Sequence, residues 1–338
     1  MIIHCLGKLC LFRTVAIFMR FAFVPVLVIT LLAALPMPRA LFGQATLEDK
    51  QEAIRPDKQE AMGPDEPPIP TEDLIKGFID DRLVNQALQQ QGMRLLDAED
   101  TVKADLLLEQ LRSVGNHIDS PLPIVEACPE GSELERCFQS TLVIANMYDC
   151  GHCDKVHVGT ATAVALSADG LVLTNHHVMN SPNKTFNFFV MSPDGRVFPV
   201  IEVLATNQQA DWAIIRVDAD DLTPVKIAEE IPDPMDPLFV VGHPHDHYYA
   251  VTTGVVSRHS RRPNRQGVYS NWMEITAKFS QGSSGSGVFN EAGELIGLVS
   301  RKSPVYSASK DGKSRTQNIT IFKAVPLTEI RKAIGLEE

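Results

Sequence analysis

The chain has 338 residues, of which 44% are hydrophobic, and its 42 acidic and 31 basic side chains give a net charge of −11 at pH 7. This length and hydrophobicity are sufficient for one large or two modest folded domains. The excess of acidic side chains argues against a nucleic-acid-binding protein, because neutralising phosphates requires basic ones.

Residues 1–45 are predicted to form a cleavable secretory signal peptide. They contain four basic and no acidic residues, and an uncharged apolar run over Phe21–Met37 is followed by the small residues Gly43 and Ala45. This layout is typical of export signals. An uncleaved membrane anchor is the alternative. We therefore expect an exported protein, periplasmic or secreted, that contacts a membrane only if this segment is retained.

Two segments lie between the signal and the main domain. Residues 46–70 are charged and Pro-rich, which predicts a disordered linker. In residues 71–120 apolar side chains recur every three or four positions, which predicts a helical arm of two amphipathic helices. We expect a solvated helical hairpin packed on its neighbour. The alternative is self-association or partner binding through residues 71–118.

Residues 121–338 are predicted to form one all-β domain, because short β-branched and aromatic runs alternate with turn residues. Many short antiparallel strands without intervening helices fit a double barrel or a sandwich. The expected strands are 158–166, 171–174, 186–190, 197–205, 212–217, 238–241, 251–257, 272–277, 288–289, 295–300 and 318–324, and a short helix over 326–334 closes the domain.

Four cysteines, Cys128, Cys137, Cys150 and Cys153, lie within 26 residues. In an exported protein they indicate disulfides, with three possible pairings. The alternatives are a four-thiolate zinc site and an active redox pair. A thioredoxin-like pair opens a helix, but here a strand is expected after Cys153, which favours a structural disulfide at the entrance to the first barrel.

Three motifs carry the chemistry of acyl transfer. In chain order they are Leu173-Thr-Asn-His-His-Val178, Asp211-Trp-Ala-Ile-Ile-Arg216 and Gln281-Gly-Ser-Ser-Gly-Ser-Gly-Val-Phe289. They supply a base, a carboxylate to orient it, and a hydroxyl nucleophile. Ser284 alone has glycine at both −2 and +1, so we expect it to be the nucleophile. The backbone amides of Gly282 and Ser284 would then form the oxyanion hole.

These motifs, with Gly242-His-Pro244 and Gly297-Leu-Val-Ser300, resemble the trypsin-like serine proteases of the HtrA (Deg) branch over roughly residues 138–335. The resemblance implies a double six-stranded β-barrel of the trypsin-like type, to which the helical arm predicted from periodicity would be N-terminal. The family's PDZ domain is not expected, because only the short helix follows the last expected strand. It also implies that His177 is the base and Asp211 its carboxylate partner. His176 stands where an Asn is usual.

The resemblance implies a primary substrate pocket formed by Lys278, Phe279 and Ser300. No acidic residue occupies the position of Lys278, so a basic substrate side chain would lack its counter-charge. We expect a small or aliphatic side chain to be preferred, with an acidic one as the alternative if Lys278 points inward.

Two groups of metal-binding side chains are also present. His243-Pro-His-Asp-His247 has alternate histidines, and Cys150, Cys153 and His157 combine thiols with an imidazole. The first group matches the Gly-x-Pro loop of the resembled family. For the second group, disulfides are expected instead. We therefore expect no metal and no cofactor.

The sequence thus predicts an exported serine endopeptidase that acts through an acyl-enzyme on unfolded or accessible segments of proteins or peptides. The alternative is a non-catalytic binding protein on a protease scaffold. The presence together of His177, Asp211 and Ser284 favours the enzyme.

Overall fold

The computed structural model describes residues 77–336, with gaps at 119–121, 123–124, 126–131, 182–183, 265 and 309–314. The expected signal peptide (1–45) and linker (46–70) lie outside the described residues, as does Cys128. Within the described part, no helix is both long and apolar enough to cross a membrane.

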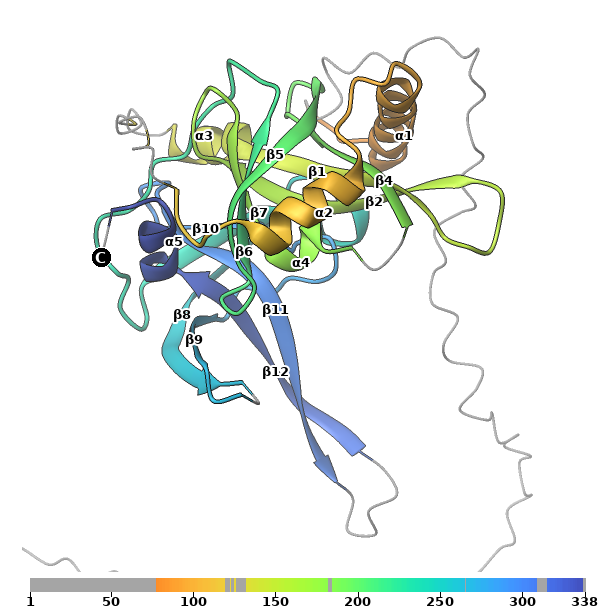
Figure 1. Ribbon diagram of the computed structural model, residues 1–338. Coiled ribbons are helices and arrows are strands. Elements are labelled where there is room, and N and C mark those ends of the chain that lie inside the picture. The colour runs from red at the N-terminus through yellow and green to blue at the C-terminus, as the bar shows by residue number, and fades with distance from the viewer. Residues whose placement is uncertain are drawn as a thin grey trace, which may run out of the picture. The chain divides into compact units, whose positions relative to one another are not determined.

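The first barrel is closed by six antiparallel strands in the order β1-β2-β3-β6-β5-β4 (Figure 1). Its strands are β1 (Thr141–Asp149), β2 (Val156–Ala165), β3 (Leu171–Thr174), β4 (Lys184–Met191), β5 (Val197–Asn207) and β6 (Trp212–Val217). The turn between β2 and β3 requires Gly170, which has a φ of +90°. A Cβ there would lie 2.2 Å from the Val217 carbonyl oxygen, so another residue would both strain the turn and clash.

The second barrel is closed in the order β10-β11-β12-β9-β8-β7. Its strands are β7 (Pro237–Gly242), β8 (Ala250–Pro263), β9 (Tyr269–Ile275), β10 (Gly287–Phe289), β11 (Leu295–Ala308) and β12 (Arg315–Pro326), followed by helix α5 (Leu327–Ala333). Strands β11 and β12 extend beyond the barrel as a long two-stranded ribbon (Figure 1). The predicted double six-stranded barrel with an N-terminal helical part is confirmed.

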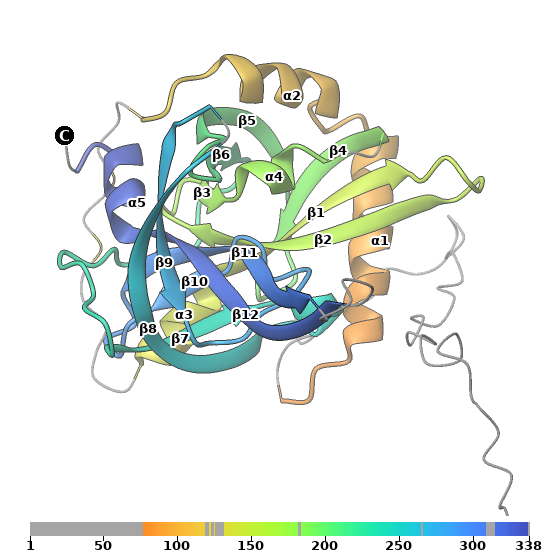
Figure 2. The same cartoon turned by 90° about the horizontal axis from the view of Figure 1, so that it is seen from below.

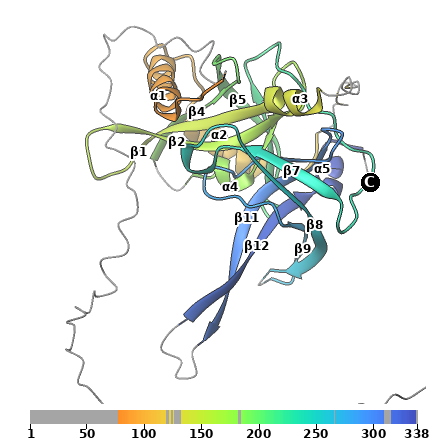
Figure 3. The same cartoon turned by 180° about the vertical axis from the view of Figure 1, so that it is seen from behind.

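Two elements that the sequence reasoning did not predict precede the first expected strand. Helix α3 (Glu133–Ser140) leads directly into β1, as Figure 3 shows. Strand β1 is almost wholly buried and pairs with both β2 and β4. A strand covered on both faces has a continuous apolar run instead of alternating apolar and polar residues. Residues 141–145, Thr-Leu-Val-Ile-Ala, form such a run.

The N-terminal helices α1 (Asp81–Asp97) and α2 (Ala104–Ser113) pack on the first barrel. Figure 2 shows α2 over β4 and β5, whereas α1 runs beside β1 and β2. They therefore dock on different strands of the barrel. The expected packing on the neighbouring domain is present, but the expected hairpin of the two helices is wrong. Two amphipathic segments with a short connection suggest a hairpin, but here the barrel offers each stripe a larger apolar surface.

Helix α1 begins where the Asp80 side chain accepts hydrogen bonds from the amides of Arg82 and Leu83, which caps the helix. Its buried face carries Val84, Ala87 and Leu88, which belong to the same core cluster as Met147 and Phe189 of the barrel. Gly92 on that face allows a close approach, because a Cβ there would lie 2.6 Å from Met147 Sδ.

Helix α2 buries Ala104, Leu107 and Leu111 in a second cluster with residues of β1, β2, β4, β5 and β6. The side-chain Oε1 of Gln110 also accepts the Val203 amide of β5 at 2.9 Å. The apolar stripe that suggested self-association thus lies against the chain's own barrel. Self-association through residues 71–118 stays a prediction.

Substituting Leu107 by alanine should lower the free energy of unfolding by about 2–5 kcal/mol, because its side chain is fully buried between α2 and the barrel. Leu106→Ala is the matched control, since the neighbouring side chain is 52% exposed, and its effect should stay within about 0.5 kcal/mol. Urea unfolding measures both. Equal effects would show that α2 does not contribute to the barrel core.

Candidate active site

His177, Asp211 and Ser284 converge from three separate loops. His177 lies in the short helix α4 (His176–Met179) after β3, Asp211 directly precedes β6, and Ser284 lies in the turn before β10. His177 Nδ1 is 3.0 Å from both carboxylate oxygens of Asp211, and His177 Nε2 is 2.9 Å from Ser284 Oγ. The three residues predicted from the motifs are therefore in hydrogen-bonding contact with one another.

The backbone around Asp211 is unusual. Asp211 is 2% exposed and has a φ of +66°, in the left-handed region that few non-glycine residues adopt. Its amide donates to the Asn207 carbonyl at 2.7 Å, and its own carbonyl accepts Asn175 Nδ2 at 2.8 Å. These hydrogen bonds hold the strained conformation, which turns the carboxylate toward His177.

Four groups surround the Asp211 carboxylate. The His177 ring and amide contact it, the Ser300 hydroxyl donates to it, and Arg301 Nη2 lies 3.4 Å from Oδ2. Burial alone would raise the pKa of Asp211, but the His177 hydrogen bond and charge, with Ser300 and Arg301, hold this pKa below its ordinary value. Asp211 is therefore ionised at neutral pH.

Arg301 directly follows the Gly297–Ser300 motif, and the sequence reasoning did not predict its contact with Asp211. Its guanidinium lies over the Trp272 ring at 4.5 Å, which positions it as a planar cation–π partner. Ser300, predicted to form the pocket wall, is only 5% exposed, and its side chain contacts Asp211.

His176 is separated from this chemistry. Its Nδ1 lies 2.9 Å from Thr206 Oγ1, and the Thr206 hydroxyl donates to the Trp212 carbonyl. Thr206 must therefore accept from His176, which fixes the proton on Nδ1. Burial lowers the pKa of His176, so this ring is a neutral structural group.

The turn that carries Ser284 is held by Thr162 of β2. The Thr162 amide donates to the Ser284 carbonyl at 2.8 Å, and its hydroxyl donates to the Gly282 carbonyl at 2.9 Å. Both glycines have positive φ, +89° at Gly282 and +84° at Gly285. A Cβ at Gly285 would lie 1.9 Å from the Thr162 carbonyl oxygen. The glycine framing of Ser284 thus reflects backbone contact between the barrels.

The amides of Gly282 and Ser284 donate no hydrogen bond to another residue that the structure describes. They differ in this respect from the amides of Ser283, Gly285 and Ser286 in the same turn, which donate to backbone carbonyls. This pattern is compatible with an oxyanion hole at Gly282 and Ser284, which stays a prediction.

The loop from His243 to His247 packs against the turn that carries Ser284. His243 is fully buried, its Nε2 donates to the Leu142 carbonyl of the first barrel at 3.2 Å, and its Nδ1 accepts the Tyr249 amide at 3.1 Å. The His243 carbonyl oxygen would lie 2.2 Å from a Cβ at Gly282. His243 is therefore a structural link between the barrels.

A cleft of about 280 Å³ borders His177 and Ser284. Its other walls include Asn146, Tyr148, Thr160 and Gln281, none of which the sequence reasoning proposed. A projecting hairpin and a turn supply these residues, and no single motif spans them.

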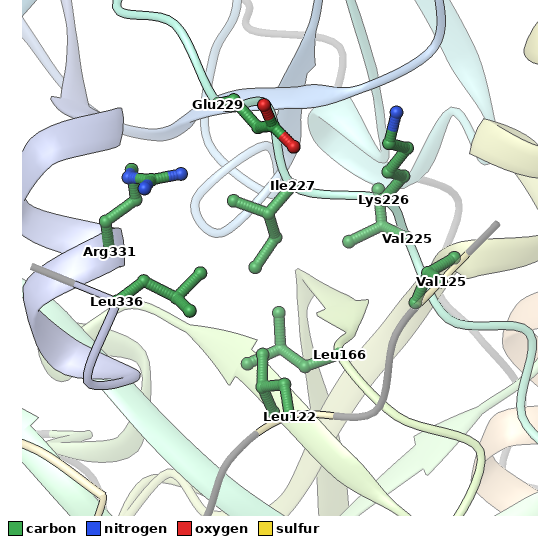
Figure 4. Close-up of a pocket in the computed structure, with 9 residues that line it drawn as sticks. All are labelled: Leu122, Val125, Leu166, Val225, Lys226, Ile227, Glu229, Arg331 and Leu336. Atoms are coloured by element: carbon green, nitrogen blue, oxygen red, sulfur yellow. The ribbon is translucent and has the colours of Figure 1, made fainter. Parts of the chain in front are cut away.

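The predicted pocket residues Lys278 and Phe279 do not line this cleft. Lys278 is exposed, whereas Phe279 is buried and packs edge-on against Phe322 with ring centroids 4.9 Å apart. A separate hollow of about 350 Å³ lies beside α5, and none of the three motif residues lines it (Figure 4).

Cys150 and Cys153 do not form a disulfide with each other in the structure, whereas a pairing with Cys128, which lies outside the described residues, stays a prediction. Cys150 and Cys153 lie in the β1–β2 loop as thiols, with their Sγ atoms 3.5 Å apart, well beyond the roughly 2.05 Å of a disulfide bond. Cys137 is buried in α3, where its Sγ donates to the Gly293 carbonyl. The Cys-x-x-Cys pair is thus at a hairpin tip and not at the entrance to the barrel, because the unpredicted strand β1 precedes it.

Two six-stranded barrels with Ser, His and Asp at their junction define the architecture of trypsin-like serine peptidases. The sequence agrees, since residues 161–298 match the family of the trypsin-like peptidase domain. This range contains all three residues.

Within that class, the chain is similar to bacterial serine endoproteases. It is 29% identical over 144 residues to the probable periplasmic serine endoprotease DegP-like of Hahella chejuensis, covering 42% of this chain and 29% of that protein. It is 26% identical over 155 residues to the serine endoprotease DegS of Escherichia coli, covering 45% and 42%. The resemblance to HtrA-like proteases is confirmed, and the chain spans less than half the length of these relatives.

Among solved structures, the crystal structure of the serine endoprotease from Yersinia pestis aligns with a TM-score of 0.43 and 21% identity, covering 62% of this chain and 66% of that one.

Acidification should destabilise the fold partly through His243. Burial lowers its pKa to about 3, whereas an unfolded chain protonates this ring near pH 6.5. Below about pH 6.5 the unfolded state therefore binds the extra proton and is favoured. Between pH 6.5 and 4.5 this group alone should reduce the free energy of unfolding by about 2 kcal/mol.

His243→Gln is the matched variant, since an amide keeps a donor and an acceptor but does not titrate. Urea unfolding of each protein, referenced to its own value at pH 7, should show the smaller acid loss in the variant. An equal acid loss in both proteins would contradict the role assigned to His243.

Proposed function

We propose that the protein is an exported serine endopeptidase in which Ser284, His177 and Asp211 form the catalytic triad. The observation that carries the proposal is the unbroken hydrogen-bond chain from the ionised Asp211 carboxylate through the His177 ring to Ser284 Oγ, beside an open cleft. A carboxylate on Nδ1 leaves the lone pair of Nε2 facing the hydroxyl, which is the tautomer a general base needs.

Acylation follows from this geometry. Ser284 Oγ bonds to the carbonyl carbon of the substrate while His177 Nε2 takes the hydroxyl proton, and the resulting oxyanion receives hydrogen bonds from the amides of Gly282 and Ser284. Cleavage of the C–N bond passes the proton from His177 to the departing amine and leaves an ester on Ser284. Water then attacks this ester with His177 again as base, which releases the acid and restores the hydroxyl.

The openness of the cleft supports the proposed substrate class. The cleft is open and is bordered by Tyr148 of β1 and Gln281 of the nucleophile turn, so an extended peptide segment has access, whereas the same segment within a folded domain does not. The Hahella chejuensis relative is named a probable periplasmic serine endoprotease and the Escherichia coli relative a serine endoprotease, in keeping with an exported enzyme that cleaves unfolded or accessible segments. The preference for a small or aliphatic side chain in the primary pocket belongs to the same proposal.

A fluorophosphonate probe, which forms a covalent bond with an activated serine, tests the nucleophile. The wild-type protein should be labelled, and Ser284→Ala should lose labelling and peptide hydrolysis by several powers of ten. Ser283→Ala changes the adjacent serine of the same turn and should retain labelling. A folded wild-type protein that is not labelled at any pH would favour a non-catalytic binding protein on this scaffold.

The two adjacent histidines test the base. His177→Ala should reduce peptide hydrolysis by several powers of ten, because the triad acts as a unit. His176→Asn keeps a donor for Thr206 and should remain within about tenfold of the wild-type rate. Activity measured on a fluorogenic peptide separates the two. Loss of activity in His176→Asn with activity retained in His177→Ala would reverse the assignment.

A further inference from the structure

Three metal-binding side chains meet at the tip of the β1–β2 hairpin, outside the site described above. Cys150 Sγ lies 3.5 Å from Cys153 Sγ, and Cys153 Sγ lies 3.1 Å from His157 Nε2. All three ligand atoms lie within 4.8 Å of one another. They come from the loop and the start of strand β2, so the hairpin itself brings them together.

These separations can be compared with those that a metal ion imposes. Tetrahedral zinc with Zn–S bonds of about 2.3 Å and Zn–N bonds of about 2.05 Å places two sulfur ligands roughly 3.8 Å apart, and sulfur and nitrogen roughly 3.5 Å apart. The observed separations lie within a few tenths of an ångström of these values for both pairs involving Cys153. A disulfide, in contrast, needs no imidazole beside it and a much shorter sulfur–sulfur distance.

From this geometry we infer that Cys150, Cys153 and His157 bind one zinc ion, with the fourth position open to solvent. Two thiolates and a neutral imidazole are a donor set that favours Zn²⁺ over the hard cations Mg²⁺ and Ca²⁺. On binding, Zn²⁺ forms bonds to both sulfurs and to Nε2, and the two thiol protons are released to solvent.

The surroundings of the three ligands support the assignment. The Asp149 carboxylate accepts the Gly151 amide at 2.7 Å, and Gly151 has a φ of +70°, so the loop folds back on itself.

The site also bears on the cleft. The His157 ring packs against the Tyr148 ring with centroids 5.5 Å apart, and the two residues pair across β1 and β2. Tyr148 lines the cleft beside His177 and Ser284. Figures 1 and 3 both show this hairpin projecting beyond the barrel. A zinc ion at its tip would fix the wall that Tyr148 contributes.

The test uses the full chain, purified with a thiol reductant, supplied with Zn²⁺ and freed of excess metal. Elemental analysis should find about one zinc per chain in the wild type. His152→Gln changes a histidine of the same loop and should keep that zinc, whereas Cys153→Ser and His157→Gln should each lose at least nine-tenths of it. Zinc retained in both of these variants, or absent from the reduced wild type, would overturn the proposal.

A second measurement needs no variant. Zn²⁺ should protect Cys150 and Cys153 from alkylation, as mapped by mass spectrometry, and Co²⁺ in place of zinc should show the intense absorption of thiolate-ligated tetrahedral cobalt. Chelation should then speed amide exchange over residues 147–158 while leaving β12 unchanged. Equal alkylation with and without Zn²⁺, or a mass two hydrogens lower from a Cys150–Cys153 disulfide in metal-supplied protein, would refute the site.

Discussion

Thr162 is the residue on which the geometry of the site depends. It belongs to the first barrel, yet its amide and hydroxyl hold the Ser284 and Gly282 carbonyls of the second barrel. The Thr162 carbonyl accepts a hydrogen bond from the Thr174 hydroxyl. Thr174 is the last residue of β3, shortly before His177. One buried strand residue thus sets the nucleophile turn relative to the segment that carries the base. Because hydrogen bonds are directional, a small rotation between the barrels would disturb both at once.

The same constraint explains why the N-terminal helices belong to the fold. Asp81 of α1 accepts the Tyr248 amide at 3.0 Å, and Asn85 of α1 accepts the Tyr248 hydroxyl at 2.9 Å. Tyr248 packs on His243, whose carbonyl abuts Gly282. Helix α1 therefore supports the loop that packs against the nucleophile turn, and the Asp81 carboxylate is used in this contact.

A feature of the fold or the site could be predicted where residues close together in the sequence determine it. The strands after residue 156 could be predicted, because each has its own apolar pattern and turn residues, and the three motif residues could be placed from short motifs. The glycines on either side of Ser284 were informative, because a side chain at either position would clash with a backbone carbonyl. Strand β1 was missed because a doubly covered strand loses its alternation. The contacts of Arg301 with Asp211 and Trp272 were missed because these partners are distant in sequence.

The role of the cysteine pair was also not predictable from local sequence alone. The spacing of Cys150 and Cys153 permits a disulfide, a redox pair or a metal site, and exported context favours the first. What separates these possibilities is the third ligand, and its position is a matter of strand register. Tyr148 pairs with His157 and Asp149 with Val156. This register places the His157 imidazole beside the sulfur atoms of the loop. A shift of one residue would turn the His157 side chain to the other face of the ribbon. The chemistry of the hairpin tip is thus decided by pairing within the barrel, which the six-residue loop by itself does not specify.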